Sequence, residues 1–386
     1  MKIIFGADIS FKNTENFEKT FVKKAMGDVR KRFAEADFSV INLENIFGNK
    51  EEYEPIPKSG PNLISVPESI EYITVMNPTV VGFANNHAMD YGKGPLLATM
   101  QHLKEQGYLC IGAGENIAEA YAPAVLSKAG ETAAVIAVCE NEFGGATENR
   151  VGSAGYSLGR VTKAIKNARE KGQCPIIYFH GGNETNPIPS PKKNELYRHF
   201  IDLGAVAVIA MHTHCPQGYE YYNECPIIYS MGNFFFVYPE SSEAKSWFYG
   251  YMTELEIEDG KTEMTLVPYR FDKMGVHILD GKEKAKMLAY LDCISRPIQS
   301  RQKLAVLFDA WCVGSVYIKR LEENFGNVYE KTPAEVATYK NLLNCEAHHE
   351  LLANVLEMIY DGDRLEKARV LQPIYEKLQN MELVEL

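Results

Sequence analysis

Residues 205–214 read Ala205-Val206-Ala207-Val208-Ile209-Ala210-Met211-His212-Thr213-His214, an apolar run that ends in two histidines separated by one residue. The run predicts a buried strand that delivers His212 and His214 into the loop after it. The single intervening residue turns one imidazole relative to the other, so both can converge on one cation or on two adjacent cations. A loop without metal can carry the same pattern, so the metal interpretation depends on the ends of other strands.

Four other apolar, strand-like runs also end in residues of the metal-ligand type. They lead into Asp8, Glu44, Asn86-His87 and His180. Asp8 and Glu44 follow consecutive strands of a predicted β-α-β unit, at the position where ligands bind in open α/β sheets. Taken alone, either carboxylate could cap a helix or lie in a solvated loop, and asparagine is a favoured N-cap residue. The repetition of the pattern at five strand ends predicts a metal site.

Composition limits the class of protein and its partners. A chain of 386 residues has room for one large α/β domain with an appendage, or for two domains. The net charge of −11 argues against nucleic acid and anionic membrane surfaces as general partners. The 8 cysteines are scattered without a Cys-x-x-Cys pair, which predicts a reducing compartment and no structural zinc. No segment reaches the roughly 18 apolar residues that span a bilayer, so we expect a cytoplasmic protein without membrane insertion.

Hydrophobic periodicity predicts alternating strands and helices over the first half of the chain. Strands are expected over residues 2–8, 37–44, 79–84, 109–111, 132–138 and 176–179, and helices over 17–36, 67–76, 95–106, 158–171 and 194–203. Hairpins are expected over residues 218–229 and 250–269, which favours a second sheet with antiparallel character.

The pattern changes to long helices without strands from about residue 282. Helices are expected over residues 282–295, 304–325, 333–360 and 365–381. We therefore expect two domains, residues 1–280 and a C-terminal helical extension over residues 281–386. The extension should contribute little direct chemistry, and His348-His349 is expected on a solvated helix face.

Six motifs resemble those of the CapA-type capsule-synthesis family, also called the poly-γ-glutamate capsule or PGA-cap family. They are Asn42-Leu43-Glu44, Phe83-Ala84-Asn85-Asn86-His87-Ala88-Met89-Asp90-Tyr91-Gly92, Gly112-Ala113-Gly114-Glu115-Asn116, His180-Gly181-Gly182-Asn183-Glu184, His212-Thr213-His214 through Gln217, and Ser230-Met231-Gly232-Asn233-Phe234. Their order and spacing agree along roughly residues 2–270, and the helical tail is not covered.

That family looks like a branch of the calcineurin-like metallophosphoesterases. The resemblance implies an α/β, metallophosphoesterase-like four-layer sandwich, in which helices flank two mixed β-sheets, with a C-terminal helical appendage. It also implies roles for single residues. Asp8 and His214 would hold a first metal, Asn86, His180 and His212 a second, Glu44 would bridge the two, and His87 would be the general acid. Asn85, Asp90, Glu184, Gln217 and Asn233 would surround and orient these groups.

One position departs from the pattern of the superfamily. The opening Asp-x-His motif is here Asp8-Ile9-Ser10, so an imidazole is missing from the first metal position. The substitution weakens that position, and a site for one metal is an alternative to a site for two. Glutamate in place of the bridging aspartate also lengthens that ligand by one methylene.

The donor set suits one or two divalent ions of Mn, Fe or Zn, because it combines carboxylate, amide oxygen and imidazole without cysteine. Such cations bind the oxygens of a phosphoester and make a bound water more acidic, while His87 could protonate the leaving oxygen. We therefore expect a metal-dependent hydrolase that acts on a phosphoester in a small molecule or polymer. Two alternatives remain: hydrolysis of an amide in a glutamyl polymer, and a non-catalytic protein that assists capsule polymer synthesis. The sequence leaves the oligomeric state open.

Overall fold

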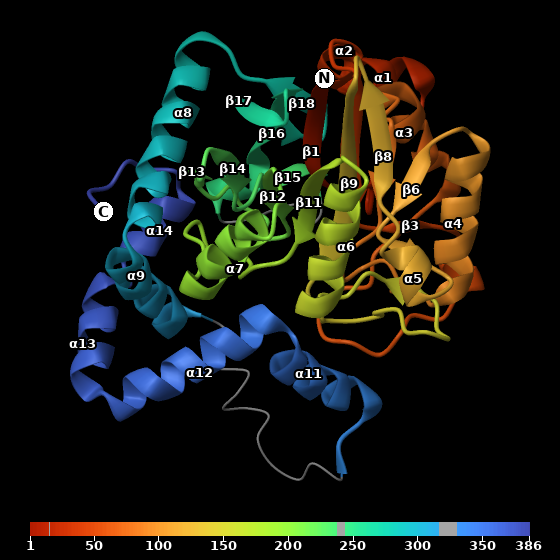
Figure 1. Ribbon diagram of the computed structural model, residues 1–386. Helices are drawn as coiled ribbons and strands as arrows, with labels where there is room; N and C mark the ends of the chain where they lie inside the picture. Colours follow the sequence, from red (N-terminus) through yellow and green to blue (C-terminus); the bar gives the residue numbers. More distant parts are fainter. Residues whose placement is uncertain (15, 238–243, 316–329) are drawn as a thin grey trace.

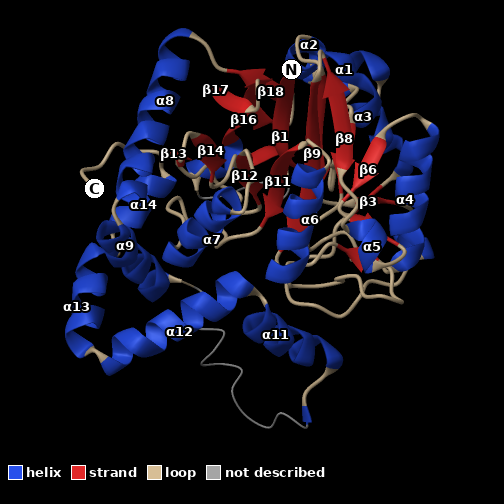
Figure 2. Cartoon of the chain, in the orientation of Figure 1, coloured by secondary structure: helices blue, strands red, loops and turns tan. Residues whose placement is uncertain are grey.

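The computed structural model describes residues 1–14, 16–237, 244–315 and 330–386. Two β-sheets pack face to face, and helices cover their outer faces (Figure 1). Each sheet contains parallel and antiparallel pairs, and further helices follow at the C-terminal side (Figure 2). The predicted α/β sandwich of two mixed sheets flanked by helices, with a helical appendage, is therefore confirmed.

The first sheet has eight strands in the order β18-β17-β16-β1-β2-β5-β6, and β15 also pairs with β1. Their bounds are β1 (Lys2–Ser10), β2 (Phe38–Leu43), β5 (Val80–Gly82), β6 (Leu109–Ile111), β15 (Asn233–Phe236), β16 (Tyr249–Glu258), β17 (Lys261–Asp272) and β18 (Gly275–Ile278). β1 is buried along almost its whole length, as its apolar sequence predicts for a strand covered on both faces. It pairs in parallel with β2 and β15, which brings Asp8 level with Asn42 and Asn233.

The second sheet has six strands in the order β13-β14-β12-β11-β9-β8. Their bounds are β8 (Ala124–Lys128), β9 (Glu131–Cys139), β11 (Cys174–His180), β12 (Ala207–Met211), β13 (Tyr219–Tyr222) and β14 (Cys225–Ile228). The run that ends in His212 forms β12, which is buried throughout and parallel to β11 and β14. Two short pairs lie outside the main sheets, β3 (Ile46–Phe47) with β4 (Ile64–Ser65) and β7 (Ala113–Gly114) with β10 (Gly152–Ser153).

Both predicted hairpins are present, and the one over residues 218–229 gives the second sheet antiparallel character, as expected, whereas the one over residues 250–269 belongs to the first sheet. The hairpin β16–β17 pairs with β1 in the first sheet, and the hairpin β13–β14 pairs with β12 in the second. One strand of each hairpin thus forms hydrogen bonds with the backbone N–H and C=O groups of a neighbouring strand, which would otherwise be unpaired at the edge of the sheet.

Helices cover the outer faces of both sheets (Figure 1). Their bounds are α1 (Lys19–Ala25), α2 (Gly27–Ala34), α3 (Ile70–Met76), α4 (Lys93–Glu105), α5 (Ile117–Ala120), α6 (Leu158–Glu170) and α7 (Pro191–Asp202). The predicted helix over residues 17–36 is two helices, because Met26 leaves helical geometry and Gly27, a poor helix former, follows it. On the second sheet, Val161 and Ile165 of α6 and Phe200 of α7 join an apolar cluster with Phe179 of β11.

Contacts between the sheets align the ends of their strands. The ring of Phe5 lies 5.8 Å from that of Tyr178, and the Tyr178 hydroxyl donates to the carbonyl of Gly6 at 2.7 Å. Each such buried aromatic ring contributes about 1.5–3 kcal/mol through burial. The packing places the carboxyl ends of β2 and β5 beside those of β11 and β12, where the side chain of Asn42 lies 3.3 Å from His180 Nδ1.

The helix predicted over residues 282–295 is confirmed, and the predictions over 333–360 and 365–381 each correspond to two shorter helices. Their bounds are α8 (Gly281–Ser295), α9 (Arg301–Gly314), α11 (Pro333–Asn344), α12 (Glu346–Tyr360), α13 (Gly362–Leu371) and α14 (Ile374–Gln379). The predicted helix over residues 333–360 is broken at Cys345, which has an extended backbone, and Pro373 interrupts the last helix. Part of the predicted helix over residues 304–325 lies outside the described residues.

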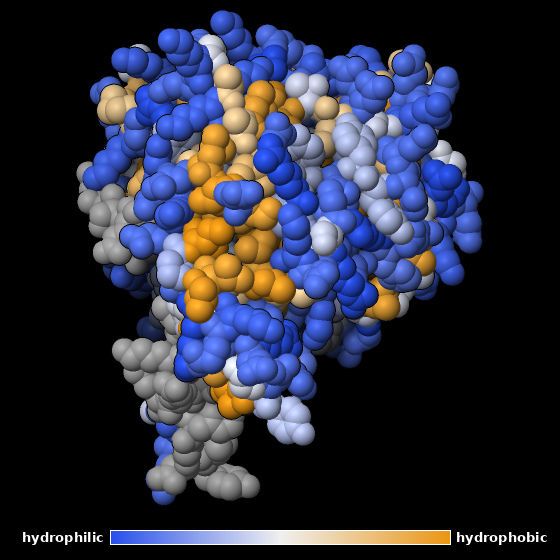
Figure 3. All heavy atoms as spheres, turned by 90° about the vertical axis from the view of Figure 1, so that its left-hand side faces the viewer, coloured by the Kyte–Doolittle hydropathy of each residue, from blue (hydrophilic) through white to orange (hydrophobic). Residues whose placement is uncertain are grey.

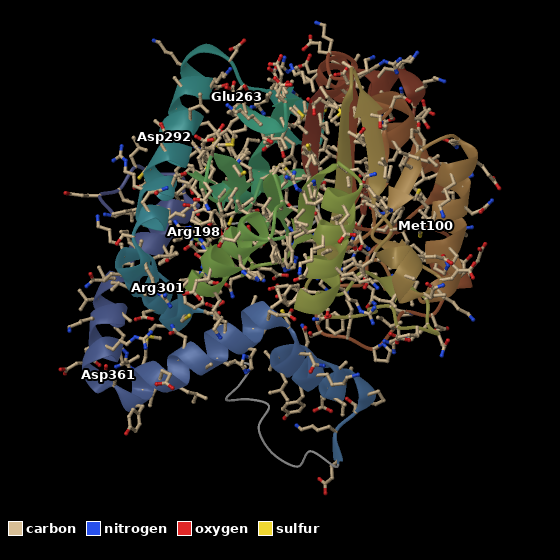
Figure 4. The ribbon with its side chains drawn as sticks, in the orientation of Figure 1. Met100, Arg198, Glu263, Asp292, Arg301 and Asp361 are labelled. Atoms are coloured by element: carbon tan, nitrogen blue, oxygen red, sulfur yellow. The ribbon has the colours of Figure 1, made fainter. Side chains whose placement is uncertain are left out.

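Of these helices, α8 and α9 pack beside the second sheet and its helix α7. Tyr219 of β13 donates its hydroxyl to Asp292 of α8 at 2.7 Å, and Arg301 of α9 lies 2.5 Å from Glu195 of α7. Asp292 and Arg301 lie on this flank together with Arg198 (Figure 4). Figure 3 shows a band of hydrophobic surface on the same flank, between hydrophilic regions. None of the helices in the described parts of the chain combines the length and the apolar character that crossing a membrane requires.

The expectation that His348 lies on a solvated helix face is wrong. His348 is only 5% exposed, because α12 packs this side against the α/β body, whereas the neighbouring His349 is exposed.

Candidate metal centre

Four of the expected ligands converge where β2, β5, β11 and β12 end. His180 Nε2 lies 2.9 Å from His212 Nδ1, 3.0 Å from Asn86 Oδ1 and 3.4 Å from Glu44 Oε1. One ligand atom each from Glu44, His180 and His212 lies within 4.8 Å of the others, and all four residues are buried. His212 has a φ of 101°, a strained backbone of the kind found at ligand sites.

Glu44 shows that a cation suits this cluster. It is fully buried, and neither carboxylate oxygen has a hydrogen-bond partner among the described residues. Burial, followed by the nearby carboxylate of Asp8, raises the pKa of Glu44 well above its usual value. Because an unpaired buried carboxylate is costly, a divalent cation held by Glu44 and the imidazoles would remove this cost.

Asp8 lies beside the cluster, with its carboxylate turned to the backbone and to His180. Its Oδ1 accepts from Asn42 Nδ2 at 2.7 Å, and its Oδ2 accepts from the backbone N–H of His212 at 2.7 Å. His180 Nδ1 is 3.1 Å from Asp8 Oδ1. A proton on Nδ1 directed at Asp8 leaves Nε2 free to face Glu44 and Asn86, so Asp8 can orient this imidazole.

Replacing Asp8 by asparagine is expected to weaken metal binding by roughly 10- to 100-fold without changing the number of ions bound, because an orienting partner of His180 is lost. Calorimetric titration with Mn²⁺ or Zn²⁺ measures both quantities. Asp28→Asn, at an exposed position on α2, is the matched control. Loss of one bound ion in Asp8→Asn would instead make Asp8 a direct ligand.

His214 lies beside the other two histidines. Its ring is 6.1 Å from that of His212, and its Nδ1 is 2.8 Å from Asn233 Oδ1. The ring packs on Trp247 at 4.7 Å, a residue that sequence reasoning missed because nothing in its local pattern signals a contact with the site. Ser10, at the position of the missing imidazole, is buried, and its hydroxyl accepts from the backbone N–H of Lys12 at 3.4 Å.

His87 is held by two charged partners. Its Nδ1 lies 2.6 Å from Asp90 Oδ2, and its Nε2 lies 3.9 Å from Glu44 Oε1. Lys58 Nζ reaches both Asp90 Oδ1 at 2.5 Å and His87 Nδ1 at 3.0 Å. Burial and the Lys58 ammonium lower the pKa of His87 to about 4. Lys58, whose side chain is only 1% exposed, comes from the polar loop after β3, and sequence reasoning missed it.

Asn85, Glu184 and Gln217, the other residues expected to surround the metal ligands, differ in what they contact. Asn85 accepts from the backbone N–H of His87 at 3.1 Å and donates to the carbonyl of Leu43 at 2.9 Å, so it ties the two ligand loops together. The charge of Glu184 contributes to the raised pKa of Glu44. Gln217 donates to the carbonyl of Asn186 at 2.7 Å, so its amide nitrogen contacts a loop and not a ligand.

Glu142 is a further acid that sequence reasoning missed. Its Oε1 lies 3.5 Å from His212 Nε2, and its Oε2 accepts from Asn341 Nδ2 of α11 at 3.2 Å. Burial, followed by the charges of Glu184 and Glu140, raises the pKa of Glu142 to about 8. A signal was present, because Glu142 closely follows the apolar strand β9, as the other acids and histidines follow theirs.

Comparison with known proteins gives a family match. The family model described as bacterial capsule synthesis protein PGA_cap matches residues 2–238, which include all the expected ligands. The PGA biosynthesis protein CapA of Bacillus subtilis (strain 168) is 29% identical over 207 residues, which cover 53% of this chain and 54% of that protein. The capsule biosynthesis protein CapA of Bacillus anthracis is 28% identical over 209 residues, which cover 52% of this chain and 51% of that protein.

A third relative, the probable polyglutamine synthesis accessory protein Rv0574c of Mycobacterium tuberculosis (strain ATCC 25618 / H37Rv), is 25% identical over 180 residues, which cover 43% of this chain and 47% of that protein. The chain thus spans about half the length of the curated relatives that it matches.

Proposed function

We propose that this chain, which belongs to the family of the bacterial capsule synthesis protein PGA_cap, is a metal-dependent hydrolase of the phosphoesterase type. The observation that carries the proposal is the convergence of Asn86, His180 and His212 on the buried carboxylate of Glu44, whose oxygens accept no hydrogen bond within the described part of the chain. Carboxylate, amide oxygen and imidazole together suit Mn, Fe or Zn. We also propose that the family domain comprises residues 1–280 and that residues 281–386 form its helical extension.

Four side chains would hold one cation, namely Glu44, Asn86, His180 and His212. Glu44 and His214 are available to a second, weaker position, which lacks an imidazole because residue 10 is serine. Divalent cations in such a site neutralise the oxygens of a phosphoester and make water acidic enough to attack it.

His87 would handle the proton. With Nδ1–H held by Asp90, the free Nε2 faces Glu44 at 3.9 Å and can take up a proton from solvent. The resulting imidazolium, stabilised by Asp90, can then donate that proton from Nε2 to the leaving oxygen. Lys58 holds Asp90 in place, and burial together with the Lys58 ammonium lowers the pKa of His87, which keeps the resting imidazole neutral.

The test is a metal titration of the wild-type chain with hydrolysis of bis(4-nitrophenyl) phosphate followed in parallel. About one ion per chain is expected at low metal, because the second position has fewer ligands and therefore a lower affinity. If both cations take part, activity should increase with filling of the weaker position. The proposal is overturned if metal-loaded protein hydrolyses neither this ester nor other phosphoesters.

Ser10 favours a second candidate, a non-catalytic protein that keeps the pocket and assists the synthesis of a capsule polymer. One relative is named an accessory protein of polyglutamine synthesis, which agrees with this role. In this case the protein would bind metal in the same titration but would not hydrolyse the phosphoester, nor a glutamyl amide assayed beside it.

A further inference from the structure

The C-terminal helices α11 and α12 fix two loops that lead away from the metal centre. Glu346, the first residue of α12, accepts from the backbone N–H of Asn141 at 3.0 Å and from its side-chain amide at 2.6 Å. The carbonyl of Ala347 accepts from Asn183 Nδ2 at 3.1 Å. Asn141 lies in the loop after β9 and Asn183 in the loop after β11, which ends in His180.

Buried charges strengthen this docking. Glu350 of α12 accepts from the Ser190 hydroxyl at 2.6 Å and from the backbone N–H of Lys192 at 3.1 Å. Nearby, Lys193 and Glu140 form a buried ion pair, and Glu140 also accepts from the backbone N–H of Gly182 at 3.0 Å. Buried networks of this kind hold a single arrangement, so α12 is fixed against the α/β body.

A cavity of about 780 Å³ lies between α11 and the loop after β9. Ala337, Lys340 and Asn344 of α11 line one side, and the β9 loop from Asn141 to Glu148 lines the other. Ile56, Pro57 and Met89 complete the lining near the loops that carry Lys58 and His87. A volume of this size is typical of pockets that hold a small-molecule ligand.

Glu142 connects this cavity with the metal centre. It lines the cavity, its Oε1 lies 3.5 Å from His212 Nε2, and its other oxygen accepts from Asn341 of α11. Helix α11 therefore holds the carboxylate of Glu142 in place between the cavity and His212, one of the expected metal ligands. A substrate that reacts at the metal centre could extend past Glu142 along α11.

The charges in the cavity favour an anion. Three cationic residues line it, Arg150, Arg160 and Lys340. Arg160 is paired with Glu148 at 2.7 Å, and Glu142 points inward to His212. Lys340 on α11 and Arg150 on the facing loop therefore leave positive charge on both sides of the outer cavity, which attracts negatively charged groups.

We propose that α11 forms one wall of the substrate cleft and that Lys340 selects substrates with a negatively charged group beyond the ester that reacts. The inference rests on the proposed hydrolase function. The family match ends at residue 238, so this wall comes from a part of the chain that the match does not cover.

The experiment compares two esters on the metal-loaded full chain, 4-nitrophenyl propyl phosphate and 4-nitrophenyl 2-carboxyethyl phosphate. They share the leaving group and differ by a carboxylate in place of a methyl group. Wild type is expected to favour the carboxylate ester roughly three- to fivefold in kcat/KM, the range for a charge pair near the surface, and added salt should reduce this preference.

Lys340→Met is expected to remove the preference through KM while kcat is retained, and Lys340→Glu to reverse it. Lys104→Met, at an exposed position on α4, is the matched control and should behave as wild type. Equal preference in wild type and Lys340→Met would overturn the role of Lys340 and leave the hydrolase function standing.

If neither ester is hydrolysed, the proposed function fails. The role of Lys340 is then tested by binding alone, by comparing the dissociation constants of the two esters in wild type and in Lys340→Met, measured by calorimetry. A preference for the carboxylate ester in wild type that is absent in Lys340→Met would support the role of Lys340. Equal affinities, or no binding of either ester, would overturn it.

Discussion

Replacing His212 by alanine is expected to abolish tight binding of a divalent cation. His212 supplies Nδ1 at 2.9 Å from His180 Nε2, so its loss leaves the most tightly held position with three ligands. The decrease in affinity should exceed the 10- to 100-fold typical of a lost orienting partner, because a direct ligand is removed. Metal content after dialysis and calorimetric titration measure the effect.

His349→Ala, at an exposed position on α12, is the matched control and should bind metal as wild type does. Thermal unfolding of both variants in the presence of a chelator separates loss of a ligand from loss of the fold. Unchanged tight binding in a folded His212→Ala protein would contradict the ligand assignment.

Replacing His87 by alanine is expected to leave metal bound and to slow hydrolysis by roughly 10²- to 10⁴-fold, the usual range for a positioned proton-transfer group. The reason is that His87 Nε2 faces Glu44 while Asp90 and Lys58 hold the other ring nitrogen. The measurements are kcat for a phosphoester at saturating metal and, in parallel, metal stoichiometry.

The exposed His102 of α4 provides the control His102→Ala, which should retain wild-type kcat. Full activity in His87→Ala would assign proton transfer to another group, and Glu142 beside His212 would then be the next candidate. Loss of bound metal in His87→Ala would instead give this residue a role in the metal site.

Much of the site could be anticipated because ligands follow apolar strands. The runs before Glu44, His180 and His212 form β2, β11 and β12, and parallel strands in packed sheets bring their carboxyl ends together. Strand periodicity depends on neighbouring residues in the chain, so local sequence reveals it. The family resemblance added what periodicity does not contain, namely the order of the motifs along the chain and the assignment of each expected ligand to one of the two metals.

Contacts between distant residues were beyond the reach of the sequence. The direct ligand role of Asp8 stays a prediction, whereas its contact with His180 Nδ1 at 3.1 Å depends on the packing of two strands that lie far apart in the sequence. Nothing in the local sequence singles out Lys58, whose side chain is buried in an ion pair with Asp90, 32 positions away.

The sequence by itself determined the strands and the polar residues at their ends, because both depend on the local hydrophobic pattern. It also determined the two mixed sheets, because the order of the motifs along the chain identifies the family that implies them. Tertiary structure alone decided the docking of α11 and α12, which joins Asn141 to Glu346 across 205 positions and buries His348. An amphipathic pattern shows that one face of a helix is buried but does not identify the surface that buries it.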